Sequence, residues 1–228
     1  IATSPAPFST TRRKPSPMRF SIDWRANSVA RSFPMPPRPP NNATARGEFD
    51  LISELFRPLT RGNAAARDLL DDAAVMQIPP GRELVTTVDA LVAEVHFLAS
   101  DGPADIAWKA LAVNLSDLAA MGADPRAYLL ATAWPRGTGD AWMEGFAAGL
   151  GEAQDSFGVT LIGGDTVATA GPLTLAITAY GTVPTGTALS RAGALPGDDI
   201  YVSGSIGDAA LGLRLATGGL DGVIEEHA

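Results

Sequence analysis

Cysteine is absent from this chain of 228 residues, and its only two histidines are His96 and His227. Without cysteine the protein has no disulfide scaffold, no thiolate metal site, no iron–sulfur cluster and no cysteine nucleophile. Two histidines are too few for histidine-based zinc chemistry. The absence of thiols is compatible with a reducing compartment, so we expect the protein to be cytoplasmic.

Long apolar runs are absent as well. No stretch approaches the ~18 consecutive apolar residues of a membrane span, and no signal-peptide core is visible. The sequence also lacks a P-loop, a dinucleotide-binding glycine fingerprint, a nucleophile elbow and the motif set of protein kinases. We therefore expect no membrane partner and none of these nucleotide or acyl-transfer sites.

Positive charge is scarce outside the N-terminal segment. Residues 1–46 carry a net charge of +7 and nine of the 18 prolines, whereas the rest of the chain carries −15. This Pro/Arg-rich segment has little apolar periodicity, so we predict a disordered extension. It could be an organelle transit peptide, a segment that binds an acidic surface, or an extension without function. The acidic remainder argues against nucleic acid as a partner, because phosphate-backbone binding needs a basic surface.

The remainder is apolar enough to form a core, since 46% of the whole chain is hydrophobic. Apolar periodicity and the positions of glycine and proline predict helices and strands in mixed order. The predicted helices are 47–59, 103–121, 140–157 and 207–217. The predicted strands are 73–78, 83–88, 128–134, 159–162, 173–183 and 200–203. Hairpin-like strand pairs are mixed with helices, so we predict an α+β (mixed α/β) fold.

Several aspartates occur where packing does not require them. Asp71 and Asp72 precede one predicted strand, Asp89 and Asp165 follow two others, and Asp117 lies inside the apolar helix 103–121. A carboxylate on a buried helix is costly unless it is paired or binds a metal. Asn114 lies three positions before Asp117, so the two side chains share a helix face.

Together these carboxylates resemble the ligand set of a hard cation. Mg²⁺ prefers oxygen ligands and commonly bridges carboxylates to substrate phosphates. The turn at Gly163-Gly164-Asp165 would let a ligand approach the backbone, and residues 204–208 lead into a helix N-terminus, which suits anions. Taken singly, Asp89 and Asp165 are better explained as structural turn positions, because aspartate is a common turn residue. We expect the fold to gather the carboxylates into one pocket for divalent cations, and Lys109 to pair with a carboxylate.

Six stretches carry most of this pattern. They are GEFDLISELF (47–56), DDAAV (71–75), TTVDALVAEVHF (86–97), WKALAVNLSDLAAMGADP (108–125), LIGGDT (161–166) and LSRAGALPGDDIYVSGSIGDAALGL (189–213). In order and spacing, over residues 46–216, they resemble the thiamine-monophosphate kinase family of the aminoimidazole-ribonucleotide-synthetase-like superfamily.

The resemblance implies transfer of the ATP γ-phosphate to the phosphate of thiamine monophosphate, assisted by Mg²⁺. It implies the metal ligands Asp72, Thr87, Asp89, Asp117 and Asp165. It further implies that Gly164, Asp165 and Arg191 bind ATP and that His96 binds the thiamine phosphate. No residue is assigned as a general base, because the acceptor is already a phosphate oxygen anion.

The resemblance also implies an organisation of the chain. Residues 47–184 would form an ATP- and Mg²⁺-binding amino-terminal domain, and residues 185–228 would begin a second domain that is cut short. Because the family shares a sheet between two subunits, we expect a homodimer. The sequence departs from the family at Leu70, where glycine is usual, and at Val88, where serine or threonine is usual.

Two alternatives remain open at this point. The chain could be another ATP-using member of the superfamily, such as a selenophosphate synthetase or a hydrogenase-maturation dehydratase. The absence of cysteine argues against the selenophosphate enzyme, which usually has a redox residue near its N-terminus. The chain could also be a non-catalytic, degenerate half-enzyme, which the two departures and the missing second domain favour modestly.

Overall fold

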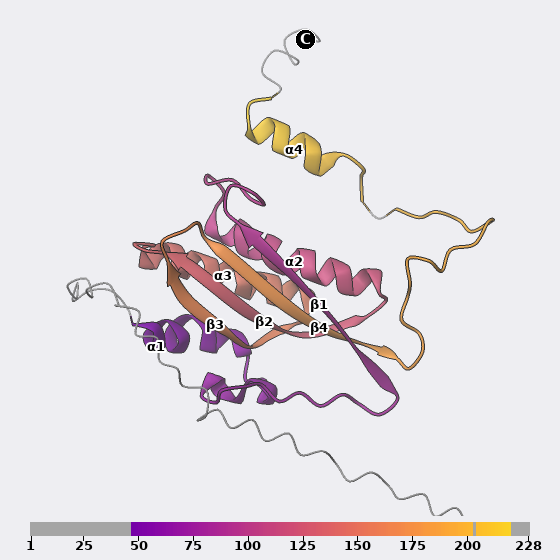
Figure 1. Cartoon of the computed structure of the whole chain (residues 1–228), viewed down its shortest axis with the longest axis horizontal. Coiled ribbons are helices and arrows are strands. Elements are labelled where there is room, and N and C mark those ends of the chain that lie inside the picture. Colours follow the sequence, from indigo (N-terminus) through magenta and orange to yellow (C-terminus); the bar gives the residue numbers. More distant parts are fainter. Residues whose placement is uncertain (1–46, 203, 220–228) are drawn as a thin grey trace, which may run out of the picture. The chain divides into compact units, whose positions relative to one another are not determined.

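A four-stranded mixed sheet forms the centre of the molecule (Figure 1), in a computed structural model that describes residues 47–202 and 204–219. In spatial order the strands are β1 (Arg82–Val92), β4 (Thr174–Pro184), β2 (Asp124–Pro135) and β3 (Thr160–Thr169). Strand β4 is antiparallel to both of its neighbours. Strands β2 and β3 are parallel, as expected for strands connected by a crossover helix. The predicted extension, residues 1–46, lies outside the described residues.

Two long helices, α2 (Pro103–Ala120) and α3 (Asp140–Phe157), cover one face of this sheet (Figure 1). Proline suits the first position of α2, since its missing N–H has no intrahelical partner there. A glycine with positive φ follows the end of each helix, Gly122 at +70° and Gly158 at +69°. The main core lies between these helices and the sheet and includes Leu111, Leu118, Phe146, Leu150, Leu175 and Ile177.

The opposite face of the sheet is covered by the N-terminal part of the described chain. It contains α1 (Glu48–Leu51), the π-helical η1 (Ile52–Phe56) and the 3-10 helices η2 (Arg57–Thr60) and η3 (Ala64–Leu69). A small second cluster buries Ala66, Ala127 and Ile162 on this side. Its modest size leaves room for a cavity between the sheet and residues 69–78.

The mixed α/β class and most predicted elements are confirmed, but two predicted strands are wrong. Residues 73–78 cross the face of the sheet and do not pair at its edge. Residues 200–202 form no strand with any described residue, and Ile200 is 92% exposed. The predicted helix 207–217 corresponds to α4 (Asp208–Ala216). Among the described residues, no helix is long and apolar enough to cross a membrane.

Strands β1 and β3 are longer than predicted, which changes the setting of two candidate residues. Asp89 lies inside β1, paired with Ile177, and Asp165 lies inside β3, paired with Ala131. Both were expected at strand ends. A strand side chain has a fixed face because successive residues alternate, so each carboxylate is held to one side of the sheet.

Candidate functional site

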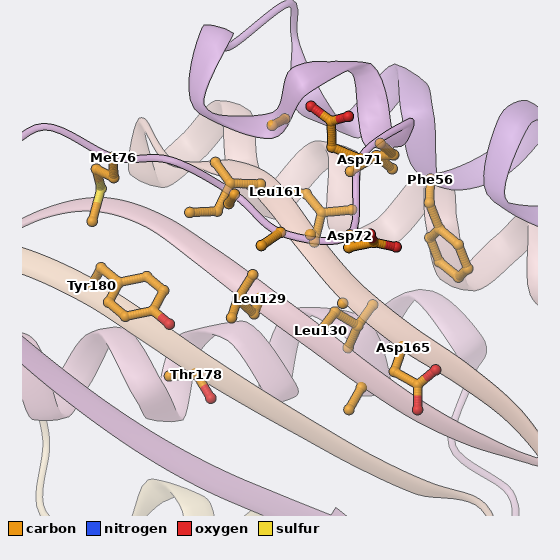
Figure 2. A pocket seen from close by; sticks show the side chains of 18 of the residues that line it. Phe56, Asp71, Asp72, Met76, Leu129, Leu130, Leu161, Asp165, Thr178 and Tyr180 are labelled. Carbon is orange, nitrogen blue, oxygen red and sulfur yellow. The ribbon is translucent and has the colours of Figure 1, made fainter. Parts of the chain in front are cut away.

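A cavity of about 810 Å³ lies on the face of the sheet opposite α2 and α3. Its walls come from all four strands and from residues 52–78. Figure 2 shows Asp71, Asp72 and Asp165 toward one side of it, with Met76 and Tyr180 toward the other. The cavity therefore combines an apolar region with a group of carboxylates, as small-molecule sites commonly do.

Asp165 reaches this cavity because glycine precedes it in β3. A Cβ atom on Gly164 would lie 1.9 Å from the carbonyl oxygen of Leu130, so β2 and β3 can approach only if this residue is glycine. The next residue, Thr166, faces the opposite side and accepts hydrogen bonds from Thr132 Oγ1 at 2.8 Å and Trp134 Nε1 at 2.9 Å. These buried bonds fix β3 against β2, and alternation then directs Asp165 into the cavity.

Asp72 enters the same cavity from a segment with an unusual backbone. Arg67, Asp68 and Leu69 have φ values of 51°, 58° and 56°, the left-handed region that residues with a Cβ rarely adopt. An ion pair between Arg67 and Asp71 holds this segment, while Asp72 makes no ion pair among the described residues. Strained backbone of this kind is concentrated at functional sites.

The departure from the family at Leu70 is compatible with this geometry. Its φ is −103°, so the position does not require glycine.

A second group of candidate residues lies on the helix-covered face. Thr87 Oγ1 donates a hydrogen bond of 3.0 Å to Asp117 Oδ2 on α2. Asp89 lies two residues after Thr87 on the same strand and therefore on the same face. Its backbone N–H donates to Asn114 Oδ1 at 2.9 Å. The structure thus brings Thr87, Asp89 and Asp117 together as predicted, and Thr87 is the partner of Asp117 that the sequence left undetermined.

The expectation that one pocket gathers all the carboxylates is wrong for the single chain. Asp89 and Asp165 lie on β1 and β3, the two edge strands, about three interstrand spacings or ~14 Å apart. Their side chains also lie on opposite faces of the sheet. No group of three or more His, Cys, Asp or Glu side chains in the described ranges is close enough to hold a metal ion. The candidate residues therefore form two sets, Asp72 with Asp165 and Thr87 with Asp89 and Asp117.

His96 lies in a tight loop after β1 that α2 holds in place. Its Nδ1 accepts a 3.0 Å hydrogen bond from the backbone N–H of Val92. Lys109 donates to the carbonyl oxygen of His96, so the prediction that Lys109 pairs with a carboxylate is wrong. Glu94, in the same loop, has φ of +65°. These contacts fix both the loop and the ring of His96.

Arg191 lies in the exposed segment that follows β4. It forms no ion pair with any other described residue, so the structure does not connect it to the cavity. Its assignment to ATP stays a prediction, as do the roles of the other candidate residues.

Two buried polar side chains, Tyr128 and Gln154, each have an atom without a hydrogen-bond partner among the described residues. Tyr128 is fully buried, and its hydroxyl has no hydrogen-bond partner among the described residues. Burial raises the pKa of this phenol, and the charge of Arg61 opposes the shift. Gln154 Oε1 is likewise without a partner there, although its amide nitrogen donates to the Leu59 carbonyl at 2.7 Å.

The sequence gives a weak signal or none for several residues that position the candidate site. For Asn114 it indicates only a helix face shared with Asp117, and for Trp134 it indicates no role. A polar residue inside an apolar helix was the available signal for Asn114. No sequence signal identifies Thr166, because its role depends on the pairing of β2 with β3.

The fold agrees with what is found among known proteins. Residues 70–183 match the AIR synthase related protein family, N-terminal domain. The chain belongs to this family.

Individual relatives share one name. The chain is 54% identical over 166 residues to the thiamine-monophosphate kinase of Caulobacter vibrioides, covering 73% of this chain and 47% of the relative. Among solved structures, thiamine-monophosphate kinase from Stenotrophomonas maltophilia K279a is 44% identical with a TM-score of 0.64, covering 72% of this chain and 53% of that one.

A further solved structure, AaThiL complexed with AMPPCP and TMP, is 28% identical with a TM-score of 0.58 and covers 76% of this chain and 55% of that one. The resemblance seen in the sequence motifs is therefore confirmed. The chain spans about half the length of the curated relatives that it matches.

Proposed function

We propose that this chain forms the nucleotide- and Mg²⁺-binding half of an enzyme that phosphorylates thiamine monophosphate to thiamine diphosphate at the expense of ATP. The observation that carries the proposal is that Asp72, Gly164 and Asp165 line one cavity, although more than 90 residues separate the first from the others. The named relatives, and AaThiL with AMPPCP and TMP, support the same reaction.

The chemistry needs charge neutralisation more than acid–base groups. The acceptor is a phosphate oxygen anion, so no side chain has to remove a proton. The difficulty is that two polyanions must approach each other, and cationic groups at the reacting phosphates reduce that repulsion. Arg191 would supply one such group, with a guanidinium that can bind phosphate through two parallel hydrogen bonds.

The residues of the site fit Mg²⁺ by their chemistry. Both sets offer only oxygen ligands, and Mg²⁺ is usually bound by one or two carboxylates together with substrate phosphates and water. A set of three carboxylates is therefore not required. We propose that Thr87, Asp89 and Asp117 hold Mg²⁺ on one side and that Asp72 and Asp165 hold it on the other. Bound Mg²⁺ would supply positive charge to the phosphoryl oxygens.

His96 is suited to bind the phosphate of the acceptor. Because its Nδ1 accepts the N–H of Val92, the neutral ring carries its proton on Nε2. That N–H is available to donate to a phosphate oxygen. The contact between Lys109 and the His96 carbonyl keeps the ring at a fixed place.

We further propose a homodimer, and a second domain that begins within residues 185–228. Val88 is 62% exposed on edge strand β1, as expected for a surface that a second copy covers. Leu195, Ile200 and Tyr201 are 70%, 92% and 89% exposed, which is unusual for apolar side chains so close together and favours cover by further polypeptide. The cytoplasmic location stays a prediction.

A turnover assay with a matched pair of variants tests the proposal. The chain is incubated with ATP, Mg²⁺ and thiamine monophosphate, and thiamine diphosphate is measured for the unchanged protein, Asp117→Ala and Ser116→Ala. Ser116 is the exposed neighbour of Asp117 on α2, so its truncation controls for effects on the helix.

The reaction is supported if turnover is lost in Asp117→Ala and kept in Ser116→Ala. Mg²⁺-dependent ATP binding without turnover would indicate a half-site that needs the remainder of the enzyme. Absence of both binding and turnover would contradict the proposal and favour a non-catalytic module.

A further inference from the structure

Asn114 connects α2 to β1 at the point where the helix-side ligands converge. Its side chain is fully buried. Its Oδ1 accepts the backbone N–H of Asp89 at 2.9 Å, and its Nδ2 donates to the carbonyl oxygen of Ala110 at 2.9 Å. One amide group is therefore bonded to the backbone of the strand and to the backbone of the helix.

Neither leucine nor an ionised aspartate, the side chains closest in size, can form both bonds. Leucine has neither donor nor acceptor, and an ionised aspartate accepts but does not donate. Glutamine is longer by one methylene, which a fully packed position tolerates poorly. The observed contacts thus specify asparagine at this position.

The bond to Asp89 is one of two that join the strand to the helix. The other is the 3.0 Å bond from Thr87 Oγ1 to Asp117 Oδ2. Thr87 and Asp89 are two residues apart on β1, and Asn114 and Asp117 are three apart on α2, so the two bonds fix the register of one element against the other. Shifting this register would move Asp89 relative to Asp117.

We propose that Asn114 is a positioning residue that holds Asp89 in the place where it can act with Asp117 and Thr87 on a divalent cation. Asn114 does so through the backbone of Asp89 and contacts no ligand itself. This inference rests on the proposed function, because it assumes that Asp89 and Asp117 bind the cation. Outer groups that orient metal ligands typically contribute 10–100-fold to metal affinity.

The effect can be measured without turnover, on the full chain of 228 residues. Mn²⁺ serves as the probe, and its affinity is measured by electron paramagnetic resonance for the unchanged protein, Asn114→Leu and Asn114→Asp. Leu118→Ala is the control, since it removes buried volume from the same helix and touches neither hydrogen bond. The exchange rate of the Asp89 amide hydrogen is followed in the metal-free proteins.

Asn114→Leu is expected to weaken Mn²⁺ binding by about 10–100-fold and to accelerate exchange of the Asp89 amide. Asn114→Asp keeps the acceptor and is expected not to weaken binding. Leu118→Ala is expected to lower stability but to leave Mn²⁺ affinity unchanged. If Asn114 has only a structural role, Asn114→Leu and Leu118→Ala should change the Mn²⁺ affinity equally when they lower stability equally. That result would overturn the proposal.

Asp117→Ala separates this inference from the proposed function. If Asp117→Ala leaves Mn²⁺ affinity unchanged, the cation site itself is wrong and the inference falls with it. If Asp117→Ala removes binding while Asn114→Leu does not change it, the site stands and the positioning role of Asn114 is refuted.

Discussion

Replacing Gly164 with alanine tests whether the close approach of β2 and β3 at the cavity requires glycine at this position. A Cβ atom at this position would lie 1.9 Å from the Leu130 carbonyl oxygen and 2.8 Å from its carbon. Ordinary van der Waals contact begins near 3.4 Å, so β3 would have to move by about 1.5 Å. That displacement is roughly a third of the ~4.8 Å spacing between strands.

The magnitude of the effect follows from this displacement. Overpacking a tight position typically costs about 1–3 kcal/mol, and the loss of about two ladder hydrogen bonds adds roughly 1 kcal/mol each. We therefore expect the free energy of unfolding to fall by about 3–5 kcal/mol. With a urea m-value of about 2 kcal/mol/M, the midpoint of unfolding would fall by roughly 1.5–2.5 M.

Urea unfolding followed by circular dichroism measures this change. Gly163→Ala is the matched control, because its Cβ would meet only the end of the Leu129 side chain, at 3.0 Å, which can rotate away. We expect a cost of about 1 kcal/mol or less for the control. An unfolding midpoint of Gly164→Ala equal to that of the unchanged protein would refute the reasoning about this contact.

Four further substitutions test backbone strain, helix packing and the burial of Tyr128. Glu94→Gly relieves a left-handed backbone (φ +65°) and should raise stability by about 0.5–1 kcal/mol in urea unfolding. Gly149→Ala would place a Cβ 2.4 Å from the Cα of Ala104 and should lower the melting temperature, whereas Gly151→Ala has only 3.6 Å contacts and should raise it. Burial raises the pKa of Tyr128 above 10.0 in the folded protein. The unfolded chain therefore loses the phenol proton first, and the free energy of unfolding falls as pH rises above about 10. Tyr128→Phe should reduce this fall when unfolding is measured from pH 9 to 11.

The long elements could be predicted from the sequence because each carries its own signals. The helix 103–121 has proline at its first position and glycine after its end, and the structure confirms it as α2 (Pro103–Ala120). The helix 140–157 is confirmed with the same bounds. Local sequence rules are sufficient to predict a helix when the apolar periodicity extends over many residues and capping residues mark both ends.

The predicted strands that the structure does not contain show that local sequence patterns do not determine strand pairing. Residues 73–78 have the composition of a strand but cross the face of the sheet and pair with no strand. A strand is defined by its partner, which sequence periodicity does not supply.

The arrangement of the candidate residues was only partly predictable from the sequence, and their roles stay predictions. The sequence indicates that Asp117 has a polar partner, because a carboxylate on an apolar helix needs one, and the structure identifies that partner as Thr87. The separation of Asp89 from Asp165 cannot be predicted from the sequence. It depends on the strand order β1-β4-β2-β3 and on side-chain alternation within β1 and β3. The face of the sheet on which a side chain lies follows from the strand register, and the sequence does not specify this register.

Equilibrium binding of ATP is the most direct test of the claim that Asp165 on β3 and Asp117 on α2 support cation-dependent binding of the nucleotide. Isothermal titration calorimetry with the full chain, with and without Mg²⁺, compares the unchanged protein with Asp165→Asn and Asp117→Asn. The account predicts that ATP binds only when Mg²⁺ is present and that each variant weakens this binding by about tenfold or more. Binding that is equally strong without Mg²⁺, or unchanged in both variants, would contradict it.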